Sequence, residues 1–182
     1  GVSPLLHKEG AFIIEAPYNI DLLEKNLFDI IYHEHLSYLS ISPLDRFFKS
    51  FGMQIFDVVK TPVHGGSIRV FVKKVGAAYK INKSVQQLLD LEKRKKLGDI
   101  NTYREFARNV GENKVKLLKL LKKLKSKHKT IAGYGAPAKS TTLLHYFGIE
   151  KGTLDFIVDD SPYKQGLFTP GKHIPVVAPE EF

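Results

Sequence analysis

The chain contains no cysteine. This absence excludes a disulfide framework and any cysteine-ligated zinc within these residues. No apolar run approaches the ~20 residues that cross a membrane, and the N-terminus shows no basic region followed by an apolar core and a cleavage site. We therefore expect a cytoplasmic protein without membrane contacts.

The charge balance is basic, with 28 lysines and arginines against 19 acids and a net charge of +9 over 182 residues. Much of the excess lies in the stretch 93–129, and no aromatic residues interleave with its lysines at 114–127. That pattern favours the solvated face of a helix and predicts no nucleic-acid partner. The length and the 43% apolar content allow one large domain or two small ones.

Short apolar runs alternate with helical periodicities, which predicts an α/β fold. Strands at 53–60 and 67–74 are expected to form an antiparallel hairpin. Strands at 130–133 and 154–158, with a helix at 137–147 between them, predict a βαβ unit.

Serine and threonine residues suggest where helices begin. Ser42 precedes Pro43 and is predicted to cap a helix that ends near Gly52. Ser84–Gln87 and Thr102–Glu105 match the capping box and predict two long helices before the strand at 130.

Four consecutive side chains that hold or transfer protons occur at Tyr32, His33, Glu34 and His35. An imidazole with a pKa near ~6.5 suits a general base, and a neighbouring carboxylate or phenol can orient it or stabilise developing charge. The alternative is a pair of loop histidines beside a solvated glutamate, and a metal site would need more ligands than this stretch supplies. In an extended strand the four side chains would alternate between two faces, so a shared site requires a turn.

A glycine-rich pattern, Gly133-Tyr134-Gly135-Ala136-Pro137-Ala138, lies between a predicted strand and a predicted helix. Its free N–H groups and the helix dipole favour an anion, so we expect phosphate binding, with the alternative of a turn that only packs helix on sheet. The residues expected to contribute are Gly135, Ala136, Lys139 and Ser140. Asp159 or Asp160, ending the next strand, could hold the ribose of a dinucleotide.

Two further segments are candidate ligand contacts. His64-Gly65-Gly66-Ser67 places glycines beside a histidine and a hydroxyl, which indicates either a ligand contact at His64, Gly65 and Ser67 or a bend that needs positive φ. Tyr163 and Lys164 follow the second strand of the βαβ unit and could line the crevice beyond its carboxyl end.

Four motifs therefore occur in one order: Phe28-Asp29-x-Ile31-Tyr32-His33-Glu34-His35-x-Ser37-Tyr38, His64-Gly65-Gly66-Ser67-x-Arg69-Val70, Gly133-Tyr134-Gly135-Ala136-Pro137-Ala138-Lys139 and Asp160-Ser161-Pro162-Tyr163-Lys164-Gln165-Gly166. Together they resemble the S-adenosylmethionine-dependent sugar C-methyltransferases of deoxysugar pathways. Members of that family have an N-terminal zinc-binding domain, a central class I methyltransferase domain and a C-terminal Rossmann-like domain. They methylate C3 of a nucleotide-linked 4-keto-6-deoxysugar.

The resemblance implies that this chain is the later part of such an enzyme. Residues 1–75 would supply the last three strands of the methyltransferase sheet, ending in its antiparallel hairpin. Residues 76–182 would be a Rossmann-like C-terminal domain, truncated at its end, with two long helices before its first strand. The S-adenosylmethionine loop and the zinc-binding cysteines would lie before residue 1, so the isolated chain is expected to be inactive and to hold no metal.

The resemblance also implies roles for the central motif. His35 would remove the C3 proton, Glu34 would orient or charge-balance it, and Tyr32 would donate a hydrogen bond to the enolate. The substrate would be a thymidine diphosphate-linked sugar. Two other functions fit the residues: a nicotinamide-dependent oxidoreductase fragment using the Gly133 loop and Asp159, and a non-enzymatic nucleotide-binding module with a basic helical arm.

Overall fold

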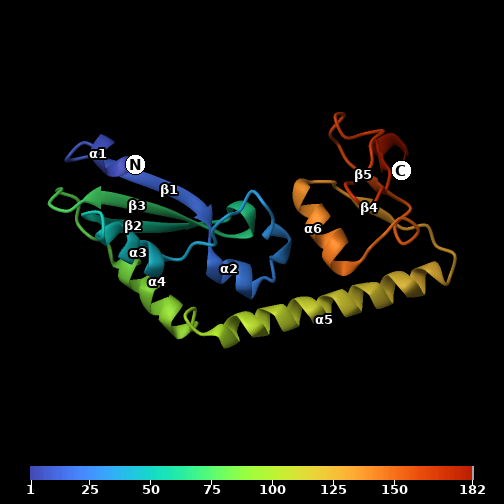
Figure 1. Cartoon of the computed structure of the whole chain (residues 1–182), viewed down its shortest axis with the longest axis horizontal. Coiled ribbons are helices and arrows are strands. Elements are labelled where there is room, and N and C mark those ends of the chain that lie inside the picture. The colour runs from blue at the N-terminus through green and yellow to red at the C-terminus, as the bar shows by residue number, and fades with distance from the viewer. Residues whose placement is uncertain (182) are drawn as a thin grey trace. The chain divides into compact units, whose positions relative to one another are not determined.

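The computed structural model describes residues 1–181. Helices and strands succeed one another along them, so the predicted α/β class is confirmed (Figure 1). The chain divides into two compact units, Gly1–Leu27 with Ser37–Phe106, and Phe28–Leu36 with Ala107–Phe182. The domain boundary expected between residues 75 and 76 stays a prediction.

The first unit is built on a three-stranded sheet in the order β1-β3-β2. Its strands are β1 (Ala11–Pro17), β2 (Met53–Thr61) and β3 (Ser67–Lys74). Because β3 is antiparallel to both neighbours, β1 and β2 run in the same direction. The predicted hairpin of β2 and β3 is confirmed.

Four helices lie wholly within this unit: α1 (Val2–Leu5), α2 (Asn19–Glu24), α3 (Ile41–Lys49) and α4 (Lys83–Arg94). α3 and α4 pack against β2 and against each other. Phe48 of α3 and Leu88 of α4 join Ile55 and Val70 of the sheet in one hydrophobic core. A 3₁₀ turn, η2 (Val63–Gly65), connects β2 to β3.

The predicted helix starts are wrong. α3 begins at Ile41, with Ser40 rather than Ser42 at the N-cap, and its first N–H groups are bound by the carboxylate of Glu92. The Ser84 hydroxyl donates to Asp57 Oδ1 at 2.6 Å instead of capping α4. At α3 a carboxylate distant in sequence takes the role that local spacing assigned to Ser42. At α4 the N-cap is Asn82, and Ser84 is bonded to a distant carboxylate.

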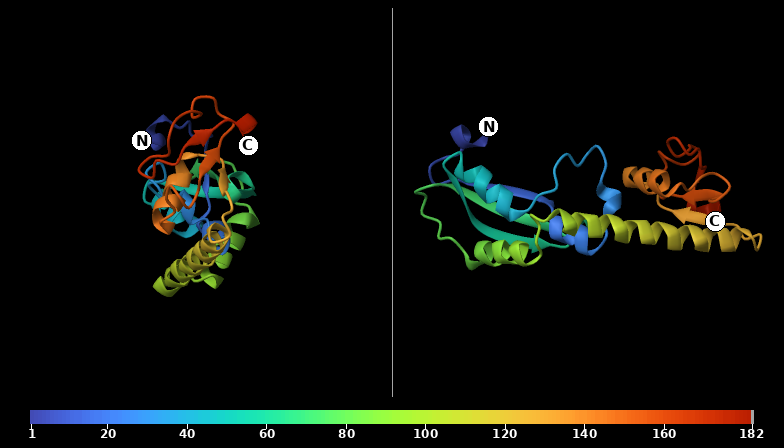
Figure 2. Two further views of the ribbon diagram at one scale, coloured as in Figure 1. Left: turned by 90° about the vertical axis from the view of Figure 1, so that its right-hand side faces the viewer. Right: turned by 60° about the horizontal axis from the view of Figure 1, so that its bottom comes forward.

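The helix α5 (Ile100–Lys125) also begins earlier than predicted, because Asp99 Oδ1 accepts the Asn101 N–H at 2.9 Å while Thr102 bonds to Lys96. Both views of Figure 2 show α5 as one continuous helix. No helix within residues 1–181 combines the length and the apolar character needed to cross a membrane.

The second unit contains the predicted βαβ unit. Its strands β4 (Ala132–Tyr134), β5 (Phe156–Val158) and β6 (Val176–Val177) form a parallel sheet in that order, and α6 (Ala138–Phe147) connects the first two. Lys125 of α5 anchors this sheet through Asp155, at 2.6 and 2.7 Å. Two 3₁₀ turns belong here as well: η1 (Phe28–Ile30) and η3 (Pro179–Glu181).

Candidate functional site

The Tyr32–His35 stretch forms a tight turn. The His35 N–H donates to the Tyr32 carbonyl at 3.0 Å. The Tyr32 hydroxyl donates to Glu34 Oε2 at 3.0 Å, and the Tyr32 ring lies edge-on to His35 with the centroids 5.1 Å apart. Phenol, carboxylate and imidazole, which an extended strand would separate, therefore lie next to one another.

The electrostatics of the turn favour a neutral phenol. The hydrogen bond to Glu34 raises the pKa of Tyr32 above its ordinary value, so the hydroxyl stays protonated near neutral pH and remains a donor. Glu34 is exposed, while Tyr32 and His35 are half-buried. The turn thus presents a proton donor, a carboxylate and an imidazole on a surface that a ligand can reach.

Phe28 and Asp29 fix the segment 28–36 onto α6. The Phe28 ring stacks on Phe147 with a centroid distance of 5.0 Å and an angle of 14°. Asp29 Oδ2 lies 3.4 Å from Lys139 Nζ. Lys139, which was expected to contact a diphosphate, therefore faces a carboxylate.

The Gly133 loop turns from β4 into α6 as its pattern predicts. Gly135 has a φ of +85°, a conformation that favours glycine. The Ala136 N–H, expected to face a phosphate, instead donates to Asp159 Oδ2 at 2.6 Å. The Ser161 N–H donates to Asp159 Oδ1 at 2.9 Å, and Lys164 Nζ donates to Oδ2 at 3.1 Å. A carboxylate therefore already occupies the Ala136 N–H of this loop.

Asp159 is buried, and these bonds lower its pKa, with the Ala136 and Ser161 N–H groups acting more strongly than Lys164. Both of its oxygens are engaged, so Asp159 would have to break these bonds to hold a ribose. Asp159, one of the two acids expected to hold a ribose, is therefore engaged within the fold, and the ribose contact stays a prediction.

A cleft of about 290 Å³ lies beside the loop. It gathers only some of the residues that the sequence singled out: Ala136, Ser140 and Lys164 line it, and Gly135, Lys139 and Tyr163 do not. The Tyr163 side chain projects into solvent, 90% exposed. Roles for these residues in substrate binding stay predictions.

The His64–Ser67 corner belongs to the first unit and has a packing explanation. Ser67 is buried, and its hydroxyl donates to the Val63 carbonyl at 2.9 Å. A Cβ at Gly66 would lie 2.5 Å from Asp21 Cβ, so glycine lets the chain pass that buried side chain. His64 and Gly65 both have positive φ. These contacts favour the bend over the ligand contact, which stays a prediction.

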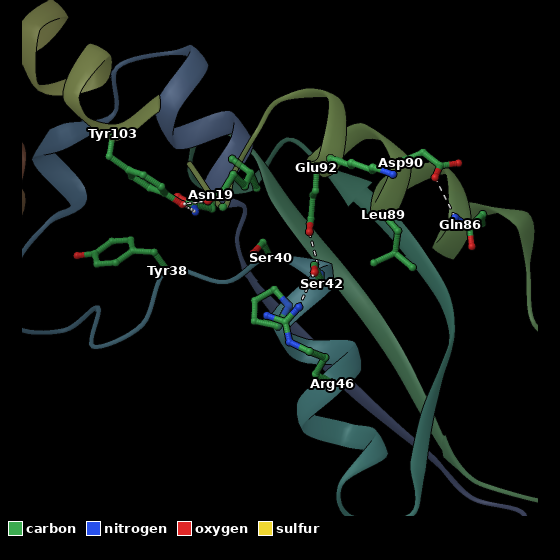
Figure 3. A pocket seen from close by; sticks show the side chains of 14 residues that line it. Asn19, Tyr38, Ser40, Ser42, Arg46, Gln86, Leu89, Asp90, Glu92 and Tyr103 are labelled. Atoms are coloured by element: carbon green, nitrogen blue, oxygen red, sulfur yellow. Dashed lines mark hydrogen bonds between the residues drawn. The ribbon is translucent and has the colours of Figure 1, made fainter. Parts of the chain in front are cut away.

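A pocket of about 670 Å³ in the first unit was not predicted from the sequence (Figure 3). Its walls come from the start of α2, the segment before α3, and the helices α3, α4 and α5. Polar side chains on these walls include Asn19, Tyr38, Ser42, Arg46, Lys93 and Tyr103. Tyr38 gave the available sequence signal, because it ends the run that contains Tyr32; the others match no ligand-binding motif.

Glu92 lines the same pocket and is buried. Its Oε1 accepts the Ile41 N–H at 2.5 Å and the Tyr18 hydroxyl at 3.1 Å, and its Oε2 accepts the Ser42 N–H at 2.8 Å. The carboxylate therefore satisfies the start of α3, where N–H groups lack partners within the helix. Burial, and after it the charge of Glu92, raise the pKa of Tyr18.

Comparison with known proteins identifies similar chains. Residues 62–182 match the family described as C-methyltransferase C-terminal domain. The chain is 39% identical over 181 residues to the C-methyltransferase NovU of Streptomyces niveus. That alignment covers 100% of this chain and 43% of NovU, so the chain spans less than half the length of this relative.

Proposed function

Because the chain belongs to the C-methyltransferase family, we propose that it is the C-terminal part of an enzyme that methylates C3 of a nucleotide-linked 4-keto-6-deoxysugar. The resemblance to the C-terminal portion of C-methyltransferases is confirmed by these matches. The sugar substrate, the C3 position and the enolisation mechanism belong to the proposal.

The topology of the first unit supports this assignment. The strand β3 lies antiparallel between β1 and β2, which run in the same direction. The resemblance predicts such a hairpin at the end of a class I methyltransferase sheet. The parallel order β4-β5-β6 similarly supports a Rossmann-like arrangement in the second unit.

The turn at Tyr32–His35 is the observation that carries the proposed chemistry. A 4-keto group makes the C3 proton acidic, and His35 is the base that takes it. Glu34 lies in the same turn and balances the charge of the imidazolium that forms. The electrons of the broken C–H bond move onto the keto oxygen, and a hydrogen bond from Tyr32 stabilises the resulting enolate.

The Tyr32 hydroxyl has a single proton, which it donates to Glu34 in this structure. An enolate oxygen must therefore replace Glu34 as the acceptor. The raised pKa of Tyr32 keeps that proton on the phenol until the substrate arrives. Release from Tyr32 also leaves the Glu34 carboxylate free to interact with the positively charged His35.

S-adenosylmethionine is the methyl donor in this proposal. The Gly133 loop does not fit it, because the Ala136 N–H is bonded to Asp159. We place cofactor binding, and the zinc expected from the resemblance, in the part of the full-length protein that this chain does not contain. The steps above therefore involve only residues of this chain.

The experiment compares His35→Ala with His33→Ala in the full-length protein. A general base contributes roughly 10² to 10⁴ in rate, so His35→Ala should lower kcat by about that factor with little change in KM. Glu34→Gln and Tyr32→Phe should give smaller losses. His33→Ala, in the same turn, controls for its conformation and should stay within about threefold of wild type.

Exchange of the substrate C3 proton with deuterated water separates enolisation from methyl transfer. His35→Ala should slow this exchange as much as turnover. Wild-type exchange in His35→Ala, or equal losses in His33→Ala, would exclude His35 as the base.

A further inference from the structure

We propose that α6 positions the turn Tyr32–His35 through the ring of Phe28 and the ion pair between Asp29 and Lys139, an inference that rests on the proposed function. The segment 28–36 belongs to the same compact unit as α6, although stretches of the first unit precede and follow it in sequence. A general base acts only within hydrogen-bond reach of the proton it removes. The contacts that orient the turn therefore affect the rate of proton removal.

Phe28 is the main anchor of this segment. Its ring stacks on that of Phe147, with the centroids 5.0 Å apart, and its centroid lies 5.7 Å from that of Tyr146. Phe147 is buried, so Phe28 packs on the interior of the second unit and not on a surface side chain. Ring pairs of this kind stabilise a structure by more than the area they bury. Removal of the Phe28 ring should therefore loosen the whole segment.

The end of α6 that receives Phe28 is itself held in place. Lys114 of α5 donates from Nζ to the Tyr146 carbonyl at 2.7 Å, and the same ammonium lies 5.2 Å from the centroid of the Tyr146 ring. Carbonyl groups in the last turn of a helix lack partners within the helix, so this bond satisfies one of them. Functional groups are positioned most precisely by rigid elements, and α6 is such an element.

The ion pair adds a second point of contact. Asp29 Oδ2 lies 3.4 Å from Lys139 Nζ, and both side chains are partly exposed, so the pair by itself contributes little to stability. Its position matters more than its strength. Lys139 lies in the first turn of α6 and Phe147 in the last, about 12 Å apart along the axis at ~1.5 Å per residue. Contacts at both ends of α6 prevent the segment from rotating about either one.

Backbone hydrogen bonds connect these anchors to the turn. The Ile31 N–H donates to the Phe28 carbonyl at 3.0 Å. The Tyr32 N–H donates to the Ile30 carbonyl at 3.1 Å, and the His35 N–H donates to the Tyr32 carbonyl. Successive bonds therefore link Phe28 to His35, so a displacement of the anchor also displaces the imidazole.

The competing role of Lys139 is the diphosphate contact that its motif suggests. A phosphate would have to replace Asp29 as the partner of the Lys139 ammonium. The two roles differ in the kinetic constant that they affect. Loss of a ligand contact raises KM and the dissociation constant, whereas displacement of a general base lowers kcat.

Exchange of the two charges in the full-length protein separates these roles. Lys139→Asp and Asp29→Lys each place like charges together and should lower kcat about fivefold, with KM for the sugar nucleotide unchanged. The double variant restores an opposite pair and should return to within about twofold of wild type. Exchange of the substrate C3 proton with deuterated water should follow kcat in all three. Lys116→Asp, at an exposed position of α5, controls for net charge and should behave like wild type.

Variants of Phe28 should give larger effects. Phe28→Ala should lower kcat about 100-fold, because a small misplacement of a reacting group costs roughly that factor. Phe28→Leu keeps an apolar side chain and should lose about tenfold. Amide hydrogen exchange across residues 28–36, measured by mass spectrometry without substrate, should be about tenfold faster in Phe28→Ala. Phe47→Leu, at an exposed ring of α3, is the matched control and should change neither quantity.

The outcomes separate this inference from the function on which it rests. A raised KM in Lys139→Asp, without recovery in the double variant, overturns the inference and assigns Lys139 to the diphosphate. Wild-type kcat and wild-type amide exchange in Phe28→Ala overturn it as well. Faster amide exchange in Phe28→Ala, with no C3 proton exchange by the wild-type protein, supports the attachment of the turn to α6 and rejects the proposed function.

Discussion

Two buried carboxylates, Glu92 in the first unit and Asp159 in the second, make nearly the same contacts with opposite consequences. Each accepts two backbone N–H groups and one side-chain donor, the Tyr18 hydroxyl for Glu92 and the Lys164 ammonium for Asp159. Glu92 satisfies the start of a helix beside a pocket whose cations stay available. Asp159 uses the N–H that a phosphate-binding loop would offer to its ligand.

The comparison shows that a glycine-rich turn between strand and helix is not by itself an anion site. The Gly133 loop has the backbone that such a site needs, including the positive φ of Gly135. Its capacity to bind an anion depends on whether its N–H donors are already paired. That pairing depends on Asp159, the residue that follows β5. A pocket without any motif can retain more binding capacity than a loop with one.

The largest effect should come from Glu92→Ala. This change leaves the N–H groups of Ile41 and Ser42 and the hydroxyl of Tyr18 buried without their acceptor. We expect a loss of about 3 kcal/mol in the free energy of unfolding, measured by urea denaturation. Asp90→Ala, one half-turn earlier on α4 and exposed, is the matched control and should cost less than about 0.5 kcal/mol. Equal losses would show that Glu92 is not the acceptor that holds the start of α3.

Asp159→Asn should cost about 2 kcal/mol, because the contacts with two backbone N–H groups become neutral, the ion pair with Lys164 is lost and one amide N–H group faces a donor. Asp160→Asn tests the adjacent residue, whose carboxylate accepts a hydrogen bond from Tyr134 at the surface, and should cost about 0.5 kcal/mol. Thermal or urea unfolding measures both.

The effect of Asp159→Asn should also depend on pH. The folded-state pKa of Asp159 is depressed from its ordinary value of 3.8, so its contribution is present above about pH 4. Protonation in wild type removes that contribution as the pH falls further, through the folded-state pKa. The gap between wild type and Asp159→Asn should therefore narrow below pH 4. A constant gap would mean that the charge of Asp159 is not what closes the loop.

Tyr18→Phe should cost about 1.5 kcal/mol at neutral pH, since it removes one donor to a charged acceptor. The folded-state pKa of Tyr18 is raised above its ordinary value of 10.0. Its contribution is therefore complete below pH 10 and is lost as the pH rises from there towards the folded-state pKa. The melting temperature of Tyr18→Phe should fall less steeply above pH 10 than that of wild type. Tyr163→Phe, at an exposed position, should follow the wild-type curve.

Local patterns predicted the parts of the fold that local interactions determine. The strands at 53–60 and 67–74 and the βαβ unit follow from apolar alternation and glycine placement. Helix starts at Ser42 and Ser84 were wrong because the deciding partners, Glu92 and Asp57, lie 50 and 27 residues away. The spacing of residues within one helical turn cannot reveal partners so distant in the sequence.

The candidate site divides in the same way. The turn that joins Tyr32, Glu34 and His35 lies within four residues. From the sequence we could infer that a shared site needs a turn there, but not that the turn forms. The pocket depends on Asn19 and Tyr103, which are 84 residues apart, and no pattern links them. The pairing of Asp159 with Ala136 could not be predicted from the sequence for a related reason. An acid at the end of a strand is placed equally well for a contact with a ribose and for a contact with a backbone N–H.

The smallest effect, and the most direct comparison of loop with pocket, should come from Gly135→Ala. At a φ of +85° an added Cβ meets only Pro137 Cδ, at 3.6 Å, so the cost is backbone strain of about 1 kcal/mol. Gly111→Ala, within α5, has open space around the added Cβ and should stabilise the protein by a similar amount through helix propensity.

The same two variants test ligand binding. If the Gly133 loop binds the diphosphate, Gly135→Ala should also weaken thymidine diphosphate binding, because the backbone there must approach the phosphates closely. We expect the affinity of both variants to equal that of wild type, since the Ala136 N–H of the loop is already bonded to Asp159. A loss of affinity in Gly135→Ala, with none in Gly111→Ala, would reverse the comparison and make the loop the binding site.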